Sequence, residues 1–379
     1  MKVVSLSIYP LKIPLIERFQ HTLKDRAASD TVVVKVRTED GICGYGEGLP
    51  RPYVTGETVE SLLAHISNVL WPAIDQQELS LDNLWDTLEN LLPQYGSQGT
   101  VRAHNAARCA VELAIVDALT QSAGQGLHEL LPPTVDHVTY SGVIAGGDAA
   151  SAARRAGQFT RVGLNHIKAK VGQEGSTDAT VARIKIIREA LGEEPVLRID
   201  ANAAWSVSEA IDTLQALEPY NVASCEEPLA AQNWAGLAEL RQQTKIPLMA
   251  DESLVTFEDA EQLVKHDAID LFNIRISKCG GIGPCLRLAL YAKENGLSYQ
   301  LGAHVGETAI LSAAGRHLAA HWGDARFVEG SYGSLLLTED LSRTSLRFGH
   351  KGRGPLLRGN GLGIQILQER IERYAEQRL

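Results

Sequence analysis

The chain has 379 residues, of which 44% are hydrophobic and 22% are charged. It is longer than one ordinary domain, and its composition is typical of a globular protein with a large core. The formal net charge of −10 argues against nucleic acid as a partner, because a polyanion would be repelled. The five cysteines are scattered and form no Cys-x-x-Cys pair, which argues against a zinc site or a disulfide framework and favours a reducing compartment.

The start of the chain and its hydropathy predict a cytoplasmic protein without a membrane partner. Pro10, Lys12 and Pro14 interrupt the first apolar stretch, so this stretch is not expected to act as a signal peptide. No run of the sequence approaches the roughly 18 apolar residues that a membrane span requires.

The first third of the chain predicts strands followed by helices. The β-branched run from Thr31 to Arg37 predicts a strand, and Glu39-Asp40-Gly41 predicts a hairpin turn into a second strand. From Thr58 to Gly124 the pattern is helical, and it is clearest from Ala103 to Ala118, where apolar residues recur at helical spacing. Strands and helices in this order indicate an α+β domain.

Beyond Pro132-Pro133, short apolar runs alternate with helical segments. Such runs are typical of parallel strands that are buried on both faces, and eight of them predict a barrel. A doubly wound open sheet has the same alternation, and periodicity does not separate the two folds. The eight runs are His137–Ile144, Asn165–Val171, Val196–Ile199, Val222–Cys225, Pro247–Ala250, Leu271–Ile276, Ser298–Leu301 and Arg326–Val328.

The alternation stops after Leu335. A Gly-rich stretch from Gly352 to Gly363 then leads into an expected helix from Gln365 to Gln377, which should pack back on the first domain. We therefore predict a capping domain over residues 1–132, completed by about 340–379, and a barrel domain over residues 133–339.

Charged residues stand at the ends of five consecutive expected strands. From the second strand to the sixth they are 25 to 30 residues apart, which is the length of one βα unit. Because barrel active sites gather at the C-terminal ends of the strands, this spacing predicts three carboxylates side by side with lysines on either flank. One such acid alone is usually a helix cap or a surface ion pair, but six charged residues in this order predict a site. They are Lys168, Lys170, Asp200, Glu226, Asp251 and Lys278.

Three converging carboxylates repel one another unless a cation lies between them. Ligation by oxygen alone suits Mg²⁺ or Mn²⁺ and does not suit zinc. Such an ion binds a substrate carboxylate and neutralises the second negative charge of an enediolate. A lysine acts as a base only if its pKa falls towards neutrality, and Lys168 and Lys170, two apart on one strand, are expected to lower each other's pKa.

Six short motifs carry a family resemblance. They are Gly44-Tyr45-Gly46-Glu47, Lys168-Ala169-Lys170, Asp200-Ala201-Asn202, Glu226-Glu227-Pro228, Ala250-Asp251-Glu252-Ser253 and Ser277-Lys278-Cys279-Gly280-Gly281. Together they resemble the enolase superfamily, and more closely its muconate lactonizing enzyme subgroup, which includes muconate cycloisomerases, dipeptide epimerases and o-succinylbenzoate synthases. The resemblance covers nearly the whole chain. It implies an α/β fold, a modified TIM barrel of the (β/α)7β type, with an α+β N-terminal capping domain.

Position by position, the resemblance implies three metal ligands, Asp200, Glu226 and Asp251, for Mg²⁺, with Mn²⁺ as a substitute. It implies that Lys170 and Lys278 are acid and base catalysts on opposite faces of the substrate.

The resemblance also implies supporting roles for three neighbours. Lys168 would tune Lys170 and contact the substrate carboxylate. Glu227 would be a neighbour of the site and not a ligand, and Asn202 would orient the substrate or the metal ligands.

Mandelate racemase-like members of the superfamily use a His–Asp dyad instead, with the histidine after strand seven and the aspartate on strand six. His304 stands near the end of the expected strand seven, but Arg275 takes the place of the aspartate. A histidine without a carboxylate to orient it is a poor base. We therefore expect His304 to be a substrate-pocket or a structural residue.

Specificity in this family comes from two N-terminal loops, here about residues 17–30 and 49–56, and from the ends of strands seven and eight. Dipeptide epimerases carry Asp-x-Asp on strand eight, where this chain has Glu329-Gly330-Ser331-Tyr332, and the following Gly333-Ser334-Leu335-Leu336-Leu337 is more similar to a muconate cycloisomerase. Glu329 alone could still pair with an ammonium group. The expected substrate-binding residues are Asn202, His304, Glu329, His21 and Tyr53.

The preferred function is a muconate cycloisomerase-like lactonizing enzyme that acts through an enolate. The alternative is a dipeptide or N-acylamino acid epimerase or racemase. Both are isomerases with a small-molecule carboxylate substrate, and the resemblance implies a homo-oligomer. A Schiff-base aldolase would need no metal, and three clustered acids argue against it. Weaker alternatives are an inactive carboxylate-binding module and a phosphate site at Gly280–Gly283.

Overall fold

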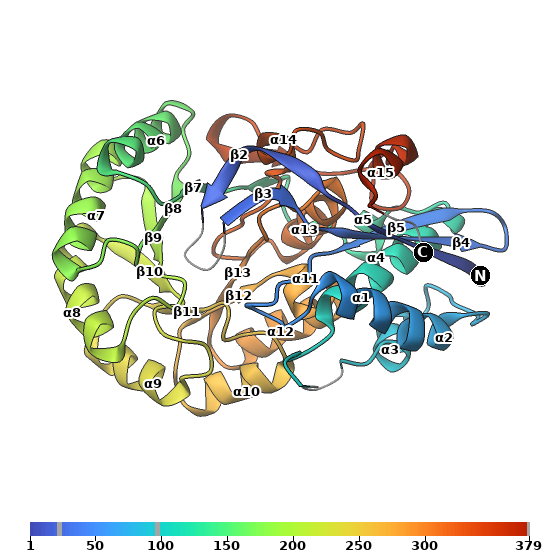
Figure 1. The fold of residues 1–379 in the computed structure, drawn as a ribbon, viewed down its shortest axis with the longest axis horizontal. Helices are drawn as coiled ribbons and strands as arrows, with labels where there is room; N and C mark the ends of the chain where they lie inside the picture. The colour runs from blue at the N-terminus through green and yellow to red at the C-terminus, as the bar shows by residue number, and fades with distance from the viewer. Residues whose placement is uncertain (21–24, 95–98, 377–379) are drawn as a thin grey trace.

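The structure is a computed structural model that describes residues 1–20, 25–94 and 99–376. The chain begins with an antiparallel sheet of strands β1 (Val3–Pro10), β4 (Val32–Thr38) and β5 (Cys43–Gly48), in the order β1-β4-β5. Strands β2 (Ile13–Gln20) and β3 (Asp25–Ser29) form a separate hairpin that reaches from this sheet towards the barrel (Figure 1). The first expected specificity loop is therefore mostly β-structure.

Helix α4 (Asn105–Ser122) packs directly on β5, so the helix expected from Ala103 to Ala118 is confirmed with slightly later ends. Glycines alternate on the strand and face alanines that recur every four residues on the helix. The two rows are Gly44, Gly46 and Gly48 on β5 and Ala106, Ala110, Ala114 and Ala118 on α4. The other helices of this region are α1 (Val59–His65), a π-helical turn (Ile66–Leu70), α2 (Trp71–Ile74), α3 (Leu84–Leu91) and α5 (Leu127–Leu130).

Replacing Gly46 by alanine is expected to destabilise the protein by about 3 kcal/mol, because the new Cβ would lie 1.9 Å from the carbonyl oxygen of Ala110. The measurement is chemical unfolding of both proteins. Gly157→Ala is the matched control, since it lies in helix α6 (Ala149–Arg161) and its new Cβ would meet no atom within 4 Å. The control is expected to raise stability by up to about 1 kcal/mol. Equal losses in the two variants would contradict the close approach of β5 to α4.

Seven parallel strands and a closing segment form the barrel. The strands are joined in chain order, and residues 326–329 complete the circle. The backbone nitrogen of Glu329 donates to Leu301 O at 2.8 Å, and that of Ser141 donates to Val328 O at 2.8 Å. The strands are β7 (Gly142–Ile144), β8 (His166–Lys170), β9 (Val196–Asp200), β10 (Val222–Glu226), β11 (Leu248–Ala250), β12 (Leu271–Ile274) and β13 (Ser298–Leu301).

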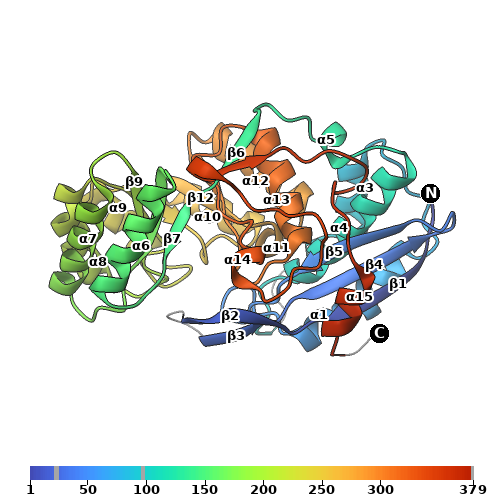
Figure 2. The ribbon, with the colours of Figure 1, turned by 90° about the horizontal axis from the view of Figure 1, so that it is seen from above.

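Helices cover the outside of the barrel, and α6 to α10 form a curved outer layer (Figure 1). The capping sheet lies at the opposite end of the molecule from α6–α9 (Figure 2). This arrangement is the expected (β/α)7β barrel with an α+β capping domain. The further helices are α7 (Thr177–Leu191), α8 (Val207–Leu217), α9 (Trp234–Gln243), α10 (Phe257–Lys265), α11 (Ile276–Cys279), α12 (Ile282–Glu294), α13 (Ala309–Trp322) and α14 (Gly333–Leu336), with 3₁₀ turns at Glu218–Tyr220 and His350–Gly352.

Two of the expected strands are wrong in their extent. The run His137–Ile144 is not one strand, because β6 (His137–Thr139) pairs antiparallel with β14 (Arg353–Pro355) and only β7 joins the barrel. The expected sixth strand ends at Ile274 instead of Ile276, because the one-turn helix α11 begins at Ile276.

The C-terminal segment returns to the capping sheet. Helix α15 (Gln368–Tyr374) lies beside it (Figure 1), and Gln368 Oε1 accepts a hydrogen bond from Lys35 Nζ at 3.1 Å. The helix is shorter than expected. The residue boundaries of the two domains stay a prediction. None of the helices in the described ranges combines the length and the apolar character that crossing a membrane requires.

Candidate active site

Strand register brings the three expected metal ligands together. Lys170 pairs with Asp200 across β8 and β9, and Asp200 pairs with Glu226 across β9 and β10. Asp251 directly follows β11, which pairs with β10. All three carboxylates are buried. They form an acid row, Asp200–Glu226–Asp251, across three neighbouring strands at the C-terminal mouth of the barrel.

Basic side chains lie between the members of the acid row. Lys168 Nζ is 3.3 Å from Asp200 Oδ2 and 3.1 Å from Glu226 Oε2. Arg275 Nη2 is 3.3 Å from Glu226 Oε1 and also contacts Asp251 Oδ2. Acids and cations therefore alternate along the row, and their charges partly compensate one another.

The two expected acid–base lysines stand at opposite ends of the acid row. Lys170 Nζ is 2.7 Å from Asp200 Oδ2, and Lys278 Nζ is 2.9 Å from Asp251 Oδ1. Lys278 is on α11 and not at a strand end, and its Nζ also donates to Asn273 O at 2.8 Å. The acid row is thus flanked by one primary amine on each side.

Asn202 and Glu227 hold the two ends of the row in place. Asn202 Oδ1 accepts a hydrogen bond from Lys170 Nζ at 2.6 Å. The carboxylate of Glu227 accepts from the backbone nitrogen of Asp251 at 2.7 Å and from Ser253 Oγ at 2.5 Å. The φ angles of Asn202 and Glu227 are 46° and 38°. Such values are uncommon for residues other than glycine and cluster at functional sites.

Burial and neighbouring charges shift the pKa values of the site. Burial and the charge of Asp200 raise the pKa of Glu226 to about 7, although Lys168 opposes this shift. Burial by itself would lower the pKa of Lys168, but the carboxylates of Glu226, Glu329 and Asp200 outweigh it and raise that pKa. The pKa of Lys168 is thus raised on balance by its carboxylate neighbours, and the expectation that Lys168 and Lys170 lower each other's pKa stays a prediction.

The acid row fits a hard divalent cation by its chemistry. No three His, Cys, Asp or Glu side chains in the described part of the chain are already arranged around a metal position, since the acids face Lys168 and Arg275. The available donors are oxygens, as Mg²⁺ prefers. Beside the row, Glu252 has a buried Oε2 without a hydrogen-bond partner among the described residues. Burial and the charges of Asp251 and Asp200 raise the pKa of Glu252 to about 7. The basic side chains of the site therefore do not fully compensate the negative charge of the acid row. The ligand set itself stays a prediction.

Beneath the acid row lies a polar layer that the sequence motifs did not predict. Asn273 Nδ2 donates to Glu226 Oε1 at 2.8 Å, and Gln300 Nε2 donates to Glu226 Oε2 at 3.3 Å. Arg198 lies in the same layer and contacts Gln300 Oε1. In the sequence these are polar residues inside otherwise apolar strands, and that interruption is the signal that could have found them. Arg275 was identified only as the replacement for an aspartate.

Both carboxylate oxygens of Glu329 form ion pairs with basic side chains of the protein. Its Oε2 is 2.9 Å from Lys168 Nζ, and its Oε1 is 2.8 Å from Arg198 Nη2. Both cations are buried. This geometry does not support the expected substrate contact of Glu329 with an ammonium group, because its charge is already compensated.

The other expected substrate-binding residues lie in different places. His304 is buried in the loop after β13, and its backbone nitrogen donates to Glu307 Oε1 at 2.6 Å. Tyr53 is half-buried and packs against a small cluster that contains Val54 and Val255. His21 lies outside the described residues. Substrate contacts by these three residues stay predictions.

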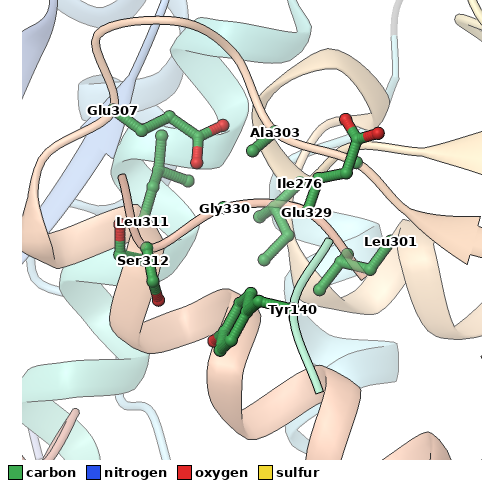
Figure 3. Close-up of a pocket in the computed structure, with 12 residues that line it drawn as sticks. Tyr140, Ile276, Leu301, Ala303, Glu307, Leu311, Ser312, Glu329 and Gly330 are labelled. Atoms are coloured by element: carbon green, nitrogen blue, oxygen red, sulfur yellow. The ribbon is translucent and has the colours of Figure 1, made fainter. Parts of the chain in front are cut away.

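A narrow cavity lies between the end of β13, residues 329–331 and helix α13. Figure 3 shows the carboxylate of Glu307 pointing towards the side of this cavity where Ala303 and Ile276 lie. Ile276 precedes Lys278 by two residues on α11, and Glu329 of the same wall contacts Lys168. One residue of the cavity wall, Glu329, is therefore in direct contact with Lys168 of the site.

The fold and the site define a barrel enzyme with an acid row between two lysines. Two family models match the chain. The model of the mandelate racemase / muconate lactonizing enzyme N-terminal domain matches residues 8–132, and the model described as enolase C-terminal domain-like matches residues 149–370. The chain belongs to the enolase superfamily, in the mandelate racemase / muconate lactonizing enzyme branch, and the expected family is confirmed.

Relatives of this chain include both expected kinds of isomerase. An N-succinyl-L-Arg/Lys racemase of Bacillus cereus is 29% identical over 98% of this chain and 97% of its own, and a crystal structure of it has a TM-score of 0.90 with coverage of 100% and 99%. A hydrophobic dipeptide epimerase of Enterococcus faecalis is 32% identical over 84% and 87%. A muconate cycloisomerase of Acinetobacter lwoffii is 29% identical over 98% and 95%. The expectation that the chain is an isomerase is confirmed at this level.

Proposed function

We propose that this protein is a racemase or epimerase that removes and returns the α-proton of a carboxylate-bearing amino-acid derivative, with Mg²⁺ as its metal. The observation that carries the proposal is the position of Lys170 and Lys278 at opposite ends of the acid row, 2.7 Å from Asp200 and 2.9 Å from Asp251. Inversion at a carbon needs a base on one face and a proton donor on the other, and one primary amine on each side of the bound substrate meets this need.

Each residue of the site then has a defined task. The neutral amine of one lysine removes the α-proton at its Nζ, and the ammonium group of the other returns a proton to the opposite face. Asn202 holds the amine of Lys170, and Lys168, which bridges Asp200 and Glu226, is placed to contact the substrate carboxylate. Asp200, Glu226 and Asp251 would hold the metal, and Mg²⁺, when bound, supplies the charge that offsets the second negative charge of an enediolate.

The relatives support the metal and the substrate class. A crystal structure of a dipeptide epimerase from Enterococcus faecalis is described as a complex with Mg and the dipeptide L-Leu-L-Tyr, and it has a TM-score of 0.86 and 29% identity to this chain, with coverage of 96% of this chain and 100% of its own. The racemase from Bacillus cereus is named for an N-succinylated amino acid. We take an N-acylamino acid as the first substrate class and a dipeptide as the second, and we expect a cytoplasmic homo-oligomer.

A muconate cycloisomerase is the second candidate, and it is the function that the sequence motifs alone favour. The observation in its favour is the state of Glu329, whose two carboxylate oxygens are bonded to Lys168 and Arg198. A dipeptide epimerase needs a free carboxylate for the ammonium group of its substrate, and Glu329 does not offer one. Lactonization needs no such group, and neither does racemisation of an N-acylamino acid.

The two candidates differ in what happens to the substrate in D₂O. We expect the α-proton signal of N-acylamino acids or dipeptides to disappear from the NMR spectrum in the presence of enzyme and Mg²⁺, with formation of the other stereoisomer. EDTA should block this exchange by removing the metal. A lactone product from muconate, without exchange of any amino-acid derivative, would contradict the proposal and favour the cycloisomerase.

A further inference from the structure

The loop between β13 and α13, residues 302–308, is anchored to the capping domain by a buried carboxylate. Glu47, at the end of β5, is fully buried. Its Oε1 accepts from the backbone nitrogen of Thr308 at 2.9 Å and from Thr31 Oγ1 at 2.8 Å. Its Oε2 accepts from Thr308 Oγ1 at 2.8 Å and from the backbone nitrogen of Leu311 at 3.0 Å. A residue of the capping sheet therefore caps a barrel helix.

Two more contacts join the same loop to the capping domain. Ser29 Oγ donates to Gly306 O at 2.7 Å, and Arg51 Nη2 donates to Val305 O at 2.8 Å. Gly306 has a φ of +95°, and a Cβ at this position would lie 2.7 Å from Ser29 Oγ, so only glycine permits the contact. Four capping residues, Thr31 included, thus fix the path of the loop.

The anchored loop places Glu307 on the wall of the cavity that Glu329 also lines (Figure 3). Glu307 Oε1 accepts from the backbone nitrogen of His304 at 2.6 Å, whereas Oε2 accepts no hydrogen bond from any described residue. No basic side chain is among the described residues that line the cavity, and its second acid, Glu329, is compensated by Lys168 and Arg198. Among the described lining residues, the cavity therefore offers two polar groups that remain available, the Oε2 of Glu307 and the buried hydroxyl of Ser312.

We propose that Glu307 binds the amide of the substrate, on the side remote from the reacting carbon, and that Glu47 is the positioning residue that holds Glu307 there. This inference rests on the proposed function. A second carboxylate, as in muconate, would meet the Glu307 carboxyl in a cavity whose described lining contains no basic side chain. Burial raises the pKa of Glu307 to about 8, so the carboxyl is mostly uncharged at neutral pH, and its Oε2, which is not used by His304, faces the N–H of an amide without repelling a neighbouring charge.

The test compares an amide with its ester. The two probes are N-succinylarginine and the analogue in which an ester oxygen replaces the amide N–H, and α-proton exchange in D₂O gives kcat and KM for each. Glu307→Ala is expected to lower the amide-to-ester ratio of kcat/KM by about tenfold, mainly through KM. The difference in intrinsic acidity between the probes cancels, because the same pair is used for every variant. Glu307→Gln keeps a donor and an acceptor and is expected to retain most of the preference.

Glu47→Gln is expected to change the amide-to-ester ratio in the same direction as Glu307→Ala, because the new amide group would meet the N–H donors of Thr308 and Leu311. Asp117→Asn is the matched control. Asp117 is also a buried carboxylate that accepts two backbone N–H groups, from Tyr45 and Leu362, both at 2.9 Å. The control is expected to lose stability but to keep the wild-type ratio.

Thr308→Val and Thr308→Ser keep the test open if Glu47→Gln does not fold. Only valine removes the hydroxyl that donates to Glu47, so valine should lower the ratio and serine should not. An unchanged ratio in Glu307→Ala would overturn the binding role of Glu307, and equal effects of Asp117→Asn and Glu47→Gln would overturn the positioning role of Glu47. Failure of the proposed function is distinguishable, since the wild-type protein would then exchange neither probe nor any other amino-acid derivative.

Discussion

Lys170→Met is expected to abolish racemisation, with a loss of at least about 10³-fold in turnover, while one enantiomer of the substrate still exchanges its α-proton with solvent. In this variant Lys278, beside Asp251, still removes the proton from its own face and returns a deuteron to that face. No amine remains at the other end of the acid row, beside Asp200, so the opposite face receives none. Lys278→Met is expected to give the mirror result, with exchange confined to the opposite enantiomer.

The measurement starts from each pure enantiomer in D₂O and follows exchange by NMR and inversion by optical rotation. Lys12→Met is the control, because that side chain is 68% exposed at the surface of the capping domain, and it should keep both activities. Lys278 is fully buried and makes three hydrogen bonds, so folding of its variant is checked by thermal unfolding. Loss of exchange from both enantiomers in each folded variant would contradict a base on either face.

The barrel and the acid row could be predicted because both depend on local patterns. Apolar runs separated by helical segments identify parallel strands, and the residue that ends each strand lies at the mouth whatever the details of packing. Asp200 and Glu226 end β9 and β10, and Asp251 directly follows β11. The close packing of β5 on α4 is likewise visible as alternating glycines opposite alanines at every fourth residue.

The partners of the site residues could not be predicted, because they depend on contacts between distant segments. Nothing local distinguishes Arg275 from a surface arginine, yet it contacts Glu226 and Asp251. The break in the first expected strand has a similar cause, since β6 pairs with β14, more than 200 residues further along the chain. The one-turn helix that carries Lys278 continues an apolar run, and a run of this length does not separate strand from helix.

Glu226→Gln and Glu227→Gln are expected to separate a metal ligand from its neighbour. Glu226 lies in the centre of the acid row, with Lys168 at 3.1 Å and Arg275 at 3.3 Å, and removing its charge is expected to weaken binding of Mn²⁺ by about 10³-fold, since a charge pair at 4 Å is worth about 4 kcal/mol near a protein surface. Glu227 instead binds the backbone of Asp251, so its variant should lose about tenfold by misplacing that ligand.

Calorimetric titration of metal-free protein with Mn²⁺ measures both affinities without any substrate. Both variants are expected to be folded before the titration, because Lys168 and Arg275 compensate the acid row in the absence of a metal. For the same reason the binding heat includes the displacement of the Lys168 and Arg275 side chains from the carboxylates. Added salt should change this binding heat by the same amount in the wild type and in Glu227→Gln. A larger loss in Glu227→Gln than in Glu226→Gln would exchange the roles of the two glutamates and would contradict the acid row as the metal site.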